Sequence, residues 1–232
     1  MTALVTGGAG FIGSHLVDAL ASRGDKVRIL DDLSTGRREN LRPDADIIQA
    51  SVVDRAALDR AMKGVDAVFH LAAVVSVQQC LDDPAGSNEV NVTGTVRVLQ
   101  AAAAAGVRRV VFASSAAVYG DTPVQPKRED HAPDPLSPYA VAKLAGERLG
   151  ATVPGVEFVA LRFFNVYGPR QAPESPYSAV IPIFLSALEA GRPLPIYGDG
   201  AQTRDFTFVG DVVSGLLLAA DAPGRHGRSI SQ

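Results

Sequence analysis

Three residues in the middle of the chain have the types and spacing of a proton-transfer site. Tyr139 and Lys143 stand four residues apart in SPYAVAKLAGE (137–147), so on a helix they share one face. There the lysine ammonium is expected to lower the pKa of the tyrosine from its usual value of about 10. Ser115, in SSAAVYG (114–120), follows an apolar run typical of a central strand, where its hydroxyl can bond both the phenol and a substrate oxygen. The pattern predicts an acid/base site, although a lysine packed beside a half-buried tyrosine has the same spacing.

A glycine-rich segment near the N-terminus, TGGAGFIG (6–13), predicts a dinucleotide-binding turn. Gly7, Gly10 and Gly13 follow the strand-like ALVT and open the helix-like IGSHLVDAL. Without Cβ atoms they let backbone N–H groups approach a pyrophosphate at the helix N-terminus. Asp31, eighteen residues after Gly13, is placed to accept hydrogen bonds from an adenosine ribose. A tight glycine turn without a ligand is the alternative interpretation.

Charges after the expected second strand indicate which dinucleotide is bound. Asp31 and Asp32 would repel a 2′-phosphate, which favours NAD over NADP. Arg37 and Arg38 could instead pair with such a phosphate, but the preferred interpretation is an exposed basic pair that opens a short helix. The predicted cofactor is therefore NAD.

A doubly wound parallel sheet is expected to position these residues. Short apolar or β-branched runs predict strands at 3–6, 27–30, 47–49, 67–70, 110–113 and 156–161. Apolar residues at helical spacing predict helices at 12–23, 56–62, 88–105 and 137–149. Strands that alternate with helices form parallel sheets covered on both faces. The predicted fold class is α/β, with a Rossmann-type NAD-binding domain over residues 1–168 that carries Ser115, Tyr139 and Lys143.

Beyond Gly168 the composition changes to proline-rich connections. A helix is expected at about 179–190, a strand-like LPIYG at 194–198 and a last helix at about 211–220. Residues 169–232 are therefore predicted to form a small, incomplete substrate-binding lobe.

Composition excludes several functional classes. A net charge of −3 and a pI of about 5.8 provide no basic field for nucleic acid. Cys80 is the only cysteine, so it is expected to be a buried thiol, and neither an intramolecular disulfide nor a metal site is predicted. No run of eighteen apolar residues and no signal-peptide pattern occurs, so the expected location is the cytoplasm, without membrane insertion.

Motifs along nearly the whole chain resemble one enzyme family. They are TGGAGFIGSHLV, DDLSTG, HLAA, NVTGTVRVL, SSAAVYG, SPYAVAK, LRFFNVYGPR and GDGAQTRDFTFVGDVV. Together they are similar to the extended short-chain dehydrogenases/reductases of the NAD-dependent epimerase/dehydratase group, and within it to the UDP-glucose 4-epimerases. The resemblance implies an enzyme that binds NAD and a nucleotide sugar, a UDP-sugar above all. It also implies a homodimer that packs two helices of each subunit, 88–105 and 137–149.

The resemblance assigns roles to residues at matching positions. The implied cofactor-binding residues are Gly7, Gly10, Phe11, Ile12, Gly13, Asp31, Asp32, Ser51, Val52, Leu71, Ala72, Ala73, Asn91, Tyr139 and Lys143. The implied substrate-binding residues are Ser115, Asn165 and Arg204. From the residues alone, Asn91 can also satisfy buried backbone, Asn165 can cap a turn, and Arg204 can form a surface ion pair.

Two alanines distinguish among the reactions of the resembled family. Its dehydratases and decarboxylases carry acidic residues between the serine and V-Y-G, whereas this chain has Ala116 and Ala117, which cannot transfer the proton that elimination of water requires. A nucleotide-sugar 4-epimerase, which oxidises C4 of the sugar transiently, is the preferred prediction. A 4-ketoreductase, a dehydratase and a non-catalytic NAD-binding protein are the alternatives, and the last is disfavoured because Tyr139 and Lys143 are both present.

Three departures from the family pattern affect the expected sites. Ser51 takes the place of an aspartate that bonds the adenine amino group, so a weaker bond or none is expected. Val75 takes the place of a lysine that some 4-epimerases have. Family members also continue further, and the final GRHGRSISQ does not resemble their next strand, so the sugar-nucleotide pocket is expected to be incomplete and its affinity low.

Overall fold

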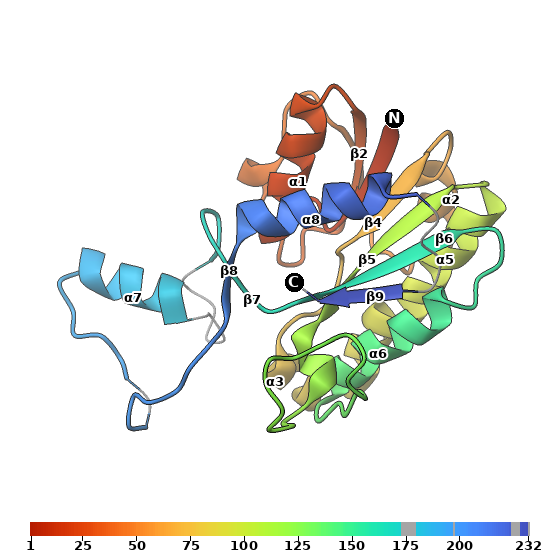
Figure 1. The fold of residues 1–232 in the computed structure, drawn as a ribbon. Coiled ribbons are helices and arrows are strands. Elements are labelled where there is room, and N and C mark those ends of the chain that lie inside the picture. The colour runs from red at the N-terminus through yellow and green to blue at the C-terminus, as the bar shows by residue number, and fades with distance from the viewer. Residues whose placement is uncertain (173–179, 197, 224–227, 232) are drawn as a thin grey trace.

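Seven parallel strands form the central sheet of the molecule (Figure 1). The computed structural model describes residues 1–172, 180–196, 198–223 and 228–231. In sheet order the strands are β3 (Asp46–Gln49), β2 (Lys26–Asp31), β1 (Thr2–Thr6), β4 (Ala67–His70), β5 (Arg109–Ser115), β6 (Glu157–Phe163) and β9 (Arg228–Ser231). The order reverses between β1 and β4, and doubly wound sheets bind ligands beyond the carboxyl ends of their strands at such a point. The predicted fold class is confirmed.

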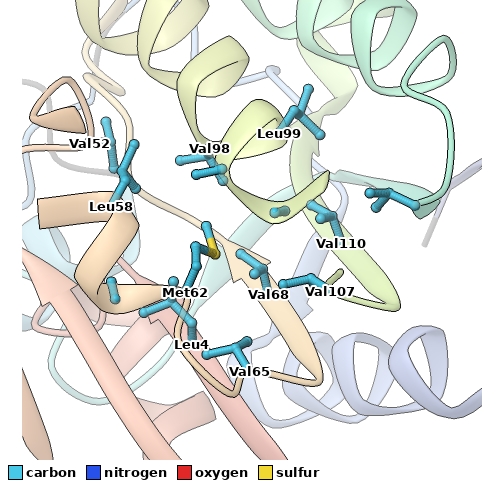
Figure 2. Close-up of a cluster of buried hydrophobic side chains, with 14 of the residues drawn as sticks. Leu4, Val52, Leu58, Met62, Val65, Val68, Val98, Leu99, Val107 and Val110 are labelled. Atoms are coloured by element: carbon cyan, nitrogen blue, oxygen red, sulfur yellow. The ribbon is translucent and has the colours of Figure 1, made fainter. Parts of the chain in front are cut away.

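Helices cover both faces of this sheet because successive residues of each buried strand point to opposite sides. Val5 packs with α1 (Phe11–Ser22) and α8 (Val209–Asp221) on one face. Leu4 packs on the other face, with α2 (Arg55–Ala61) and α5 (Thr95–Ala104), in the cluster of buried side chains that Figure 2 shows. The helix α6 (Pro138–Gly150) lies on the same face as α5.

The sequence predicted these elements closely where packing and local preference agree. Each of the six predicted strands is present, with ends within two residues of expectation. The helices predicted at 12–23, 56–62 and 137–149 are α1, α2 and α6, each displaced by one residue.

The single helix predicted over 88–105 is wrong, because the structure divides this region. It consists of the end of α4 (Pro84–Asn88), a π-helical turn η2 (Glu89–Gly94) and α5. The wider turn brings Gly94 against Val52, where a Cβ on the glycine would lie 2.7 Å from Val52 Cγ2. Such turns occur frequently at functional sites, and this one faces the segment that follows β4.

A further helix, α3 (Val77–Asp82), was not predicted, since six residues are too few to establish an apolar period. Ser76 caps it by accepting a hydrogen bond from the N–H of Gln79 at 3.1 Å. The helix carries Cys80, which is buried as expected. Across the described residues, no helix combines the length and apolar character that a membrane span requires.

Two elements that follow Gly168 pack with the domain predicted over residues 1–168. Both come from the residues assigned to the substrate lobe. Helix α8 packs on α1 and against β5 and β6 of the main sheet, and β9 pairs with β6 as a strand of that sheet. Among the described residues, α7 (Val180–Glu189) and the two-stranded sheet of β7 (Asn165–Tyr167) and β8 (Phe206–Phe208) are separate from the main sheet, although the small sheet contacts α8 (Figure 1).

Two expectations for the C-terminal region also need correction. The final residues, which do not resemble the strand of the family, nevertheless form β9, because the edge of β6 offers unpaired backbone groups to them. The strand-like LPIYG forms no strand at 194–196, and Tyr197 lies outside the described residues, as does residue 179 at the start of the predicted helix.

Candidate active site

The glycine turn between β1 and α1 lies at the point where the strand order reverses. Gly7 has a φ of +73°, and a Cβ on it would lie 2.8 Å from the backbone nitrogen of Ala72. A Cβ on Gly13 would lie 2.1 Å from the carbonyl oxygen of Gly7. Helix α1 and the segment after β4 therefore approach this turn as closely as backbone allows, and only glycine fits there.

The start of α1 fits the pyrophosphate of a dinucleotide. Phe11, Ile12 and Gly13 form the first turn of this helix, where N–H groups have no carbonyl partner within the helix. In this fully described helix the first turn carries no acidic side chain, so the positive end of the helix dipole is available to an anion. The glycine motif thus has the structural context that its interpretation required.

Asp31 ends β2 beside the glycine turn and is buried, with 7% of its surface exposed. Its Oδ2 accepts the N–H of Ala9 at 2.9 Å, and its Oδ1 accepts the N–H of Leu33 at 2.8 Å. Leu33 adopts a φ of +61°, a backbone conformation that residues other than glycine rarely adopt. The loop thereby turns back toward the carboxylate of Asp31. Each carboxylate oxygen keeps a further lone pair for a ribose hydroxyl, which stays a prediction.

The basic pair after β2 is occupied within the protein. Arg38 Nη2 donates to Gln49 Oε1 at 2.7 Å, and Arg37 Nη1 lies 3.4 Å from Glu39 Oε1. Arg38 opens a short 3₁₀ helix, as the preferred interpretation of the sequence predicted. Asp32 is exposed at the same edge, where its charge disfavours a 2′-phosphate. This arrangement suits NAD.

The residues at two departures from the family pattern, Ser51 and Val75, are placed differently from one another. Ser51 Oγ accepts the N–H of Val53 at 3.4 Å, so the serine side chain stabilises the turn that follows β3. Val52 is 3% exposed and packs in the cluster of Figure 2, which leaves its predicted cofactor contact to the backbone. Val75 is 64% exposed and can contribute only an apolar surface.

A chain of buried hydrogen bonds fixes the end of β4. Thr6 Oγ1 lies 2.7 Å from His70 Nδ1, and His70 Nε2 lies 3.0 Å from Thr95 Oγ1. Thr95 gives its one hydroxyl proton to the carbonyl of Asn91 at 2.7 Å, so Nε2 must donate and Nδ1 must accept. Thr6 therefore donates to His70 and accepts the N–H of Ala72 at 3.2 Å. Burial, aided by a neighbouring ammonium, lowers the pKa of His70 to about 3, so the ring is neutral.

The segment after β4 carries three of the predicted cofactor-binding residues. Leu71, Ala72 and Ala73 are half-buried there. Asn91, 4% exposed, pairs with both backbone groups of Val74: its Oδ1 accepts the N–H at 2.8 Å, and its Nδ2 donates to the carbonyl at 2.9 Å. Asn91 thus satisfies buried backbone, as the alternative interpretation has it, and its contact with the cofactor stays a prediction.

Ser115, Tyr139 and Lys143 come together at the carboxyl end of β5. Ser115 ends that strand, and its side chain is hydrogen-bonded with that of Tyr139 in the first turn of α6. Lys143, 4% exposed, lies one turn further, with Nζ 5.7 Å from the centroid of the Tyr139 ring. The structure assembles the cluster that the spacing predicted.

The protonation of this cluster differs from expectation. Burial raises the pKa of Tyr139 to about 12, against the opposing effect of the hydrogen bond with Ser115. Burial also lowers the pKa of Lys143 to about 8. The predicted lowering of the tyrosine pKa is wrong for the chain alone, because Lys143 Nζ donates to the carbonyl of Ala113 at 2.8 Å instead. Tyr139 is a neutral proton donor at neutral pH.

The turn that follows Ser115 carries methyl groups where an acid would be needed for elimination. A 3₁₀ turn, η3 (Ala116–Tyr119), begins there, and Ser115 Oγ accepts the N–H of Ala117 at 3.2 Å. Ala116 and Ala117 are half-buried beside the cluster, and neither can donate or accept a proton.

Two of the three predicted substrate residues lie at the small sheet, with Asn165 on β7 and Arg204 just before β8. Asn165 begins β7, directly beyond the end of β6 that pairs with Ser115, and its Nδ2 donates to the carbonyl of Asp205 at 3.2 Å. Arg204 is exposed, and its Nη1 donates to the carbonyl of Thr203 at 2.7 Å. The pairing of β7 with β8 therefore brings both residues to one strand end, and their contacts with a nucleotide sugar stay predictions.

Sequence reasoning gave no role to several buried polar residues of the quoted motifs. His70 lies within HLAA, Glu147 ends SPYAVAKLAGE, and Arg162 lies within LRFFNVYGPR. A polar side chain in an otherwise apolar strand, or a carboxylate on the inner face of a helix, needs a buried partner, and that need was the available signal.

Comparisons with known proteins find the same family that the sequence motifs resemble. A model of the NAD dependent epimerase/dehydratase family matches residues 3–231. A UDP-glucose 4-epimerase of Mycolicibacterium smegmatis is 44% identical over 234 residues, which cover 97% of this chain and 74% of that protein. A UDP-N-acetyl-alpha-D-glucosaminuronate decarboxylase of Bacillus cytotoxicus is 40% identical over 228 residues, which cover 94% of this chain and 70% of that protein. The crystal structure of the Thermus thermophilus UDP-glucose 4-epimerase in complex with NAD has a TM-score of 0.89 at 38% identity, and the match covers 99% of this chain and 76% of that one.

Proposed function

The chain belongs to the NAD dependent epimerase/dehydratase family, and we propose that it is an NAD-dependent nucleotide-sugar 4-epimerase acting on UDP-hexoses. One observation carries the proposal: the cluster of Ser115, Tyr139 and Lys143 stands beside Ala116 and Ala117. Epimerisation at C4 needs one group that removes and returns a proton, whereas elimination needs a further acid. The similarity to a protein named as a UDP-glucose 4-epimerase supports the choice of base and sugar.

The residues present fit NAD. The first turn of α1 would hold the pyrophosphate, the carboxylate of Asp31 would accept the ribose hydroxyls, and Lys143 would bond the nicotinamide ribose. When bound, NAD supplies the acceptor for the hydride removed from C4 of the sugar and the donor that returns it.

The side chains of the cluster have separate tasks. Ser115 would bond the C4 oxygen of the sugar and hold it beside the phenol. Tyr139 would take the proton of the C4 hydroxyl during oxidation and give it back to the same oxygen after the sugar has turned over. Its pKa of about 12 keeps it protonated in the chain alone, so the base form must be generated inside the loaded site.

The direct test is incubation with UDP-glucose, UDP-galactose and the corresponding dTDP- and GDP-sugars, with the configuration at C4 read by NMR. Interconversion of the UDP-hexoses supports the proposal. The Tyr139→Phe variant is the matched control, since it should keep NAD and lose at least about a hundredfold in turnover. A dehydrated or decarboxylated product, or activity of that variant within about threefold of the parent, would refute the assignment.

A 4-ketoreductase uses the same three residues but exchanges its cofactor at every turnover. The absorbance of the purified protein distinguishes the two, because an epimerase retains NAD or NADH through purification. Protein that purifies without dinucleotide and consumes NADH stoichiometrically with a 4-keto sugar would favour the reductase.

We also propose a homodimer that packs helices of the 88–105 region and α6 against their symmetry mates. Val141 and Leu149 on α6 are 52% and 38% exposed, and Val92 and Val96 are half-exposed on the neighbouring helical segment. Exposed apolar residues at helical spacing suit a bundle interface. Sedimentation at tens of micromolar should give a dimer, and Val141→Glu should give a monomer, whereas a monomeric parent would contradict the proposal.

A cytoplasmic location is proposed on chemical grounds. Cys80 is buried and reduced, which suits a reducing compartment. Fractionation of cells that produce the tagged protein tests the location.

A further inference from the structure

Three buried polar side chains behind the candidate active site form one network. Ser114, Glu147 and Arg162 are 3%, 5% and 4% exposed. Arg162 donates from Nε to Glu147 Oε1 at 2.9 Å and from Nη2 to Oε2 at 2.7 Å. Ser114 Oγ donates to the same Oε1 at 2.5 Å. Arg162 therefore binds the carboxylate of Glu147 in a bidentate geometry, which fixes the position and the plane of the carboxylate.

Two members of this network adjoin residues of the catalytic cluster, and the third lies opposite one of those two. Ser114 directly precedes Ser115 on β5. Glu147 follows Lys143 by one turn of α6, on the same face of the helix. Arg162 stands opposite Ser114 in the register of β5 and β6. The network thus joins the strand that carries the serine to the helix that carries the lysine.

Arg162 also reaches the turn on the other side of the serine. Its Cζ lies 4.7 Å from the centroid of the Tyr119 ring, which is fully buried at the end of η3. Both the residue before Ser115 and the turn after it therefore contact the guanidinium directly or through Glu147.

Packing alone sets the distance between α6 and the sheet. A Cβ on Gly146 would lie 2.6 Å from Phe112 Cζ, so the helix backbone rests on the strand side chains. Apolar contacts of this kind are not directional, however, and resist a slide or rotation of the helix less than they resist separation. The directional bonds of Glu147 supply what packing lacks, together with the bond from Lys143 Nζ to the carbonyl of Ala113.

Stability gives a poor account of this network. A buried ion pair costs desolvation that its attraction often fails to offset, and apolar pairs of similar size are frequently as stable or more so. Geometry gives a better account, since a misplacement of about 1 Å at a reacting group can cost on the order of a hundredfold in rate.

We propose that Ser114, Glu147 and Arg162 are positioning residues that set the register of Tyr139 and Lys143 against Ser115. They touch neither substrate nor cofactor and act through the residues they hold. The turnover part of the test rests on the proposed function, and the structural part does not.

The test is the paired variant Glu147→Met with Arg162→Met, which replaces the ion pair by apolar side chains of similar length. We expect a melting temperature equal to or above that of the parent and an NAD dissociation constant within about threefold. We expect kcat to fall about ten- to a hundredfold with KM for the UDP-sugar within about threefold. A crystal structure of the variant should show the hydrogen bond between Ser115 and Tyr139 lost.

The chain provides a matched control on the same two strands. Arg109 is fully buried at the start of β5 and forms an ion pair with Glu157 at the start of β6. This pair lies at the amino ends of the two strands, whereas the cluster lies at the carboxyl end of β5. Arg109→Met with Glu157→Met should change the melting temperature and leave kcat per folded molecule within about twofold.

Three outcomes would overturn the proposal. The first is a folded paired variant that keeps the parental kcat and the hydrogen bond between Ser115 and Tyr139. The second is a loss of NAD binding in step with kcat, which would indicate a general structural role. If the paired variant does not fold, Ser114→Ala decides: kcat should fall about three- to tenfold, and an unchanged kcat would be the third. If the parent itself turns over no nucleotide sugar, the proposed function fails, and the crystal structure alone decides the positioning role.

Discussion

Replacement of Lys143 by methionine tests the electrostatic state of the site. Lys143 is 4% exposed, and burial lowers its pKa from 10.5 to about 8. A shift of about 2.5 units corresponds to about 3 kcal/mol, at about 1.4 kcal/mol per unit. Below pH 8 the folded and unfolded chains both carry the lysine proton, so the folded chain bears this cost in full.

The sign of the pH dependence follows from proton counts. Between pH 8 and pH 10.5 the folded lysine has released its proton and the unfolded lysine has kept it, so the free energy of unfolding rises with pH. From about pH 8 to about pH 9.5 the parent should gain roughly 2 kcal/mol relative to Lys143→Met, which has no titrating group at this position. Above pH 10 the raised pKa of Tyr139 acts in the opposite direction, so the measurement stops at about pH 9.5.

The assay is urea unfolding of cofactor-free protein at intervals from about pH 7.5 to about pH 9.5. Lys63→Met, which removes an exposed ammonium in the turn after α2, is the matched control and should track the parent. A difference between parent and Lys143→Met that stays constant within about 0.5 kcal/mol would show that the buried amine bears no such cost.

Three further substitutions, at His70, Asp31 and Ser115, test other residues of the candidate active site. Burial lowers the pKa of His70 from 6.5 to about 3, so acidification from about pH 6.5 to about pH 4.5 should cost the parent roughly 2 kcal/mol that His70→Gln does not lose. Urea unfolding at the two pH values measures this, and a gap independent of pH would contradict it. Asp31→Arg should weaken NAD and relieve the exclusion of NADP, since a phosphate-pairing cation replaces a ribose-bonding carboxylate; calorimetry with both cofactors decides, and an unchanged preference would mean that Asp31 does not face the ribose. Ser115→Ala should lower kcat by roughly ten- to a thousandfold, and an effect on substrate affinity alone would make Ser115 a binding residue.

The fold could be predicted where each local preference agrees with its burial. The runs ALVT and AVFH are β-branched or apolar, and their strands are buried on both faces, so pattern and structure coincide. The π-helical turn η2 could not be predicted, because the apolar spacing over 88–105 also fits one continuous helix and the approach of Gly94 to Val52 appears only in the folded chain. The pairing of β7 with β8 joins three-residue segments about forty residues apart, and a segment so short has no period to detect.

The cluster itself could be predicted because its spacing is local. Four residues on a helix fix the relation of Tyr139 to Lys143, and a strand end fixes Ser115. The tyrosine pKa could not be predicted, since it depends on where the lysine ammonium points and on how deeply the phenol is buried. The partners of Glu147 come from two strands, so only the assembled sheet shows them.

Two buried bases, His70 and Lys143 of the cluster, lie close together, and only one of them carries a charge at neutral pH. The ring of Phe112 lies with its centroid 5.7 Å from that of His70 and 4.9 Å from Lys143 Nζ. His70 is held neutral because its burial disfavours the charged ring and the ammonium of Lys143 opposes a second charge nearby, and Thr6 can then donate to Nδ1. The positive charge in this space therefore belongs to Lys143, and the bond chain through His70 keeps the segment after β4 in place without adding a competing charge.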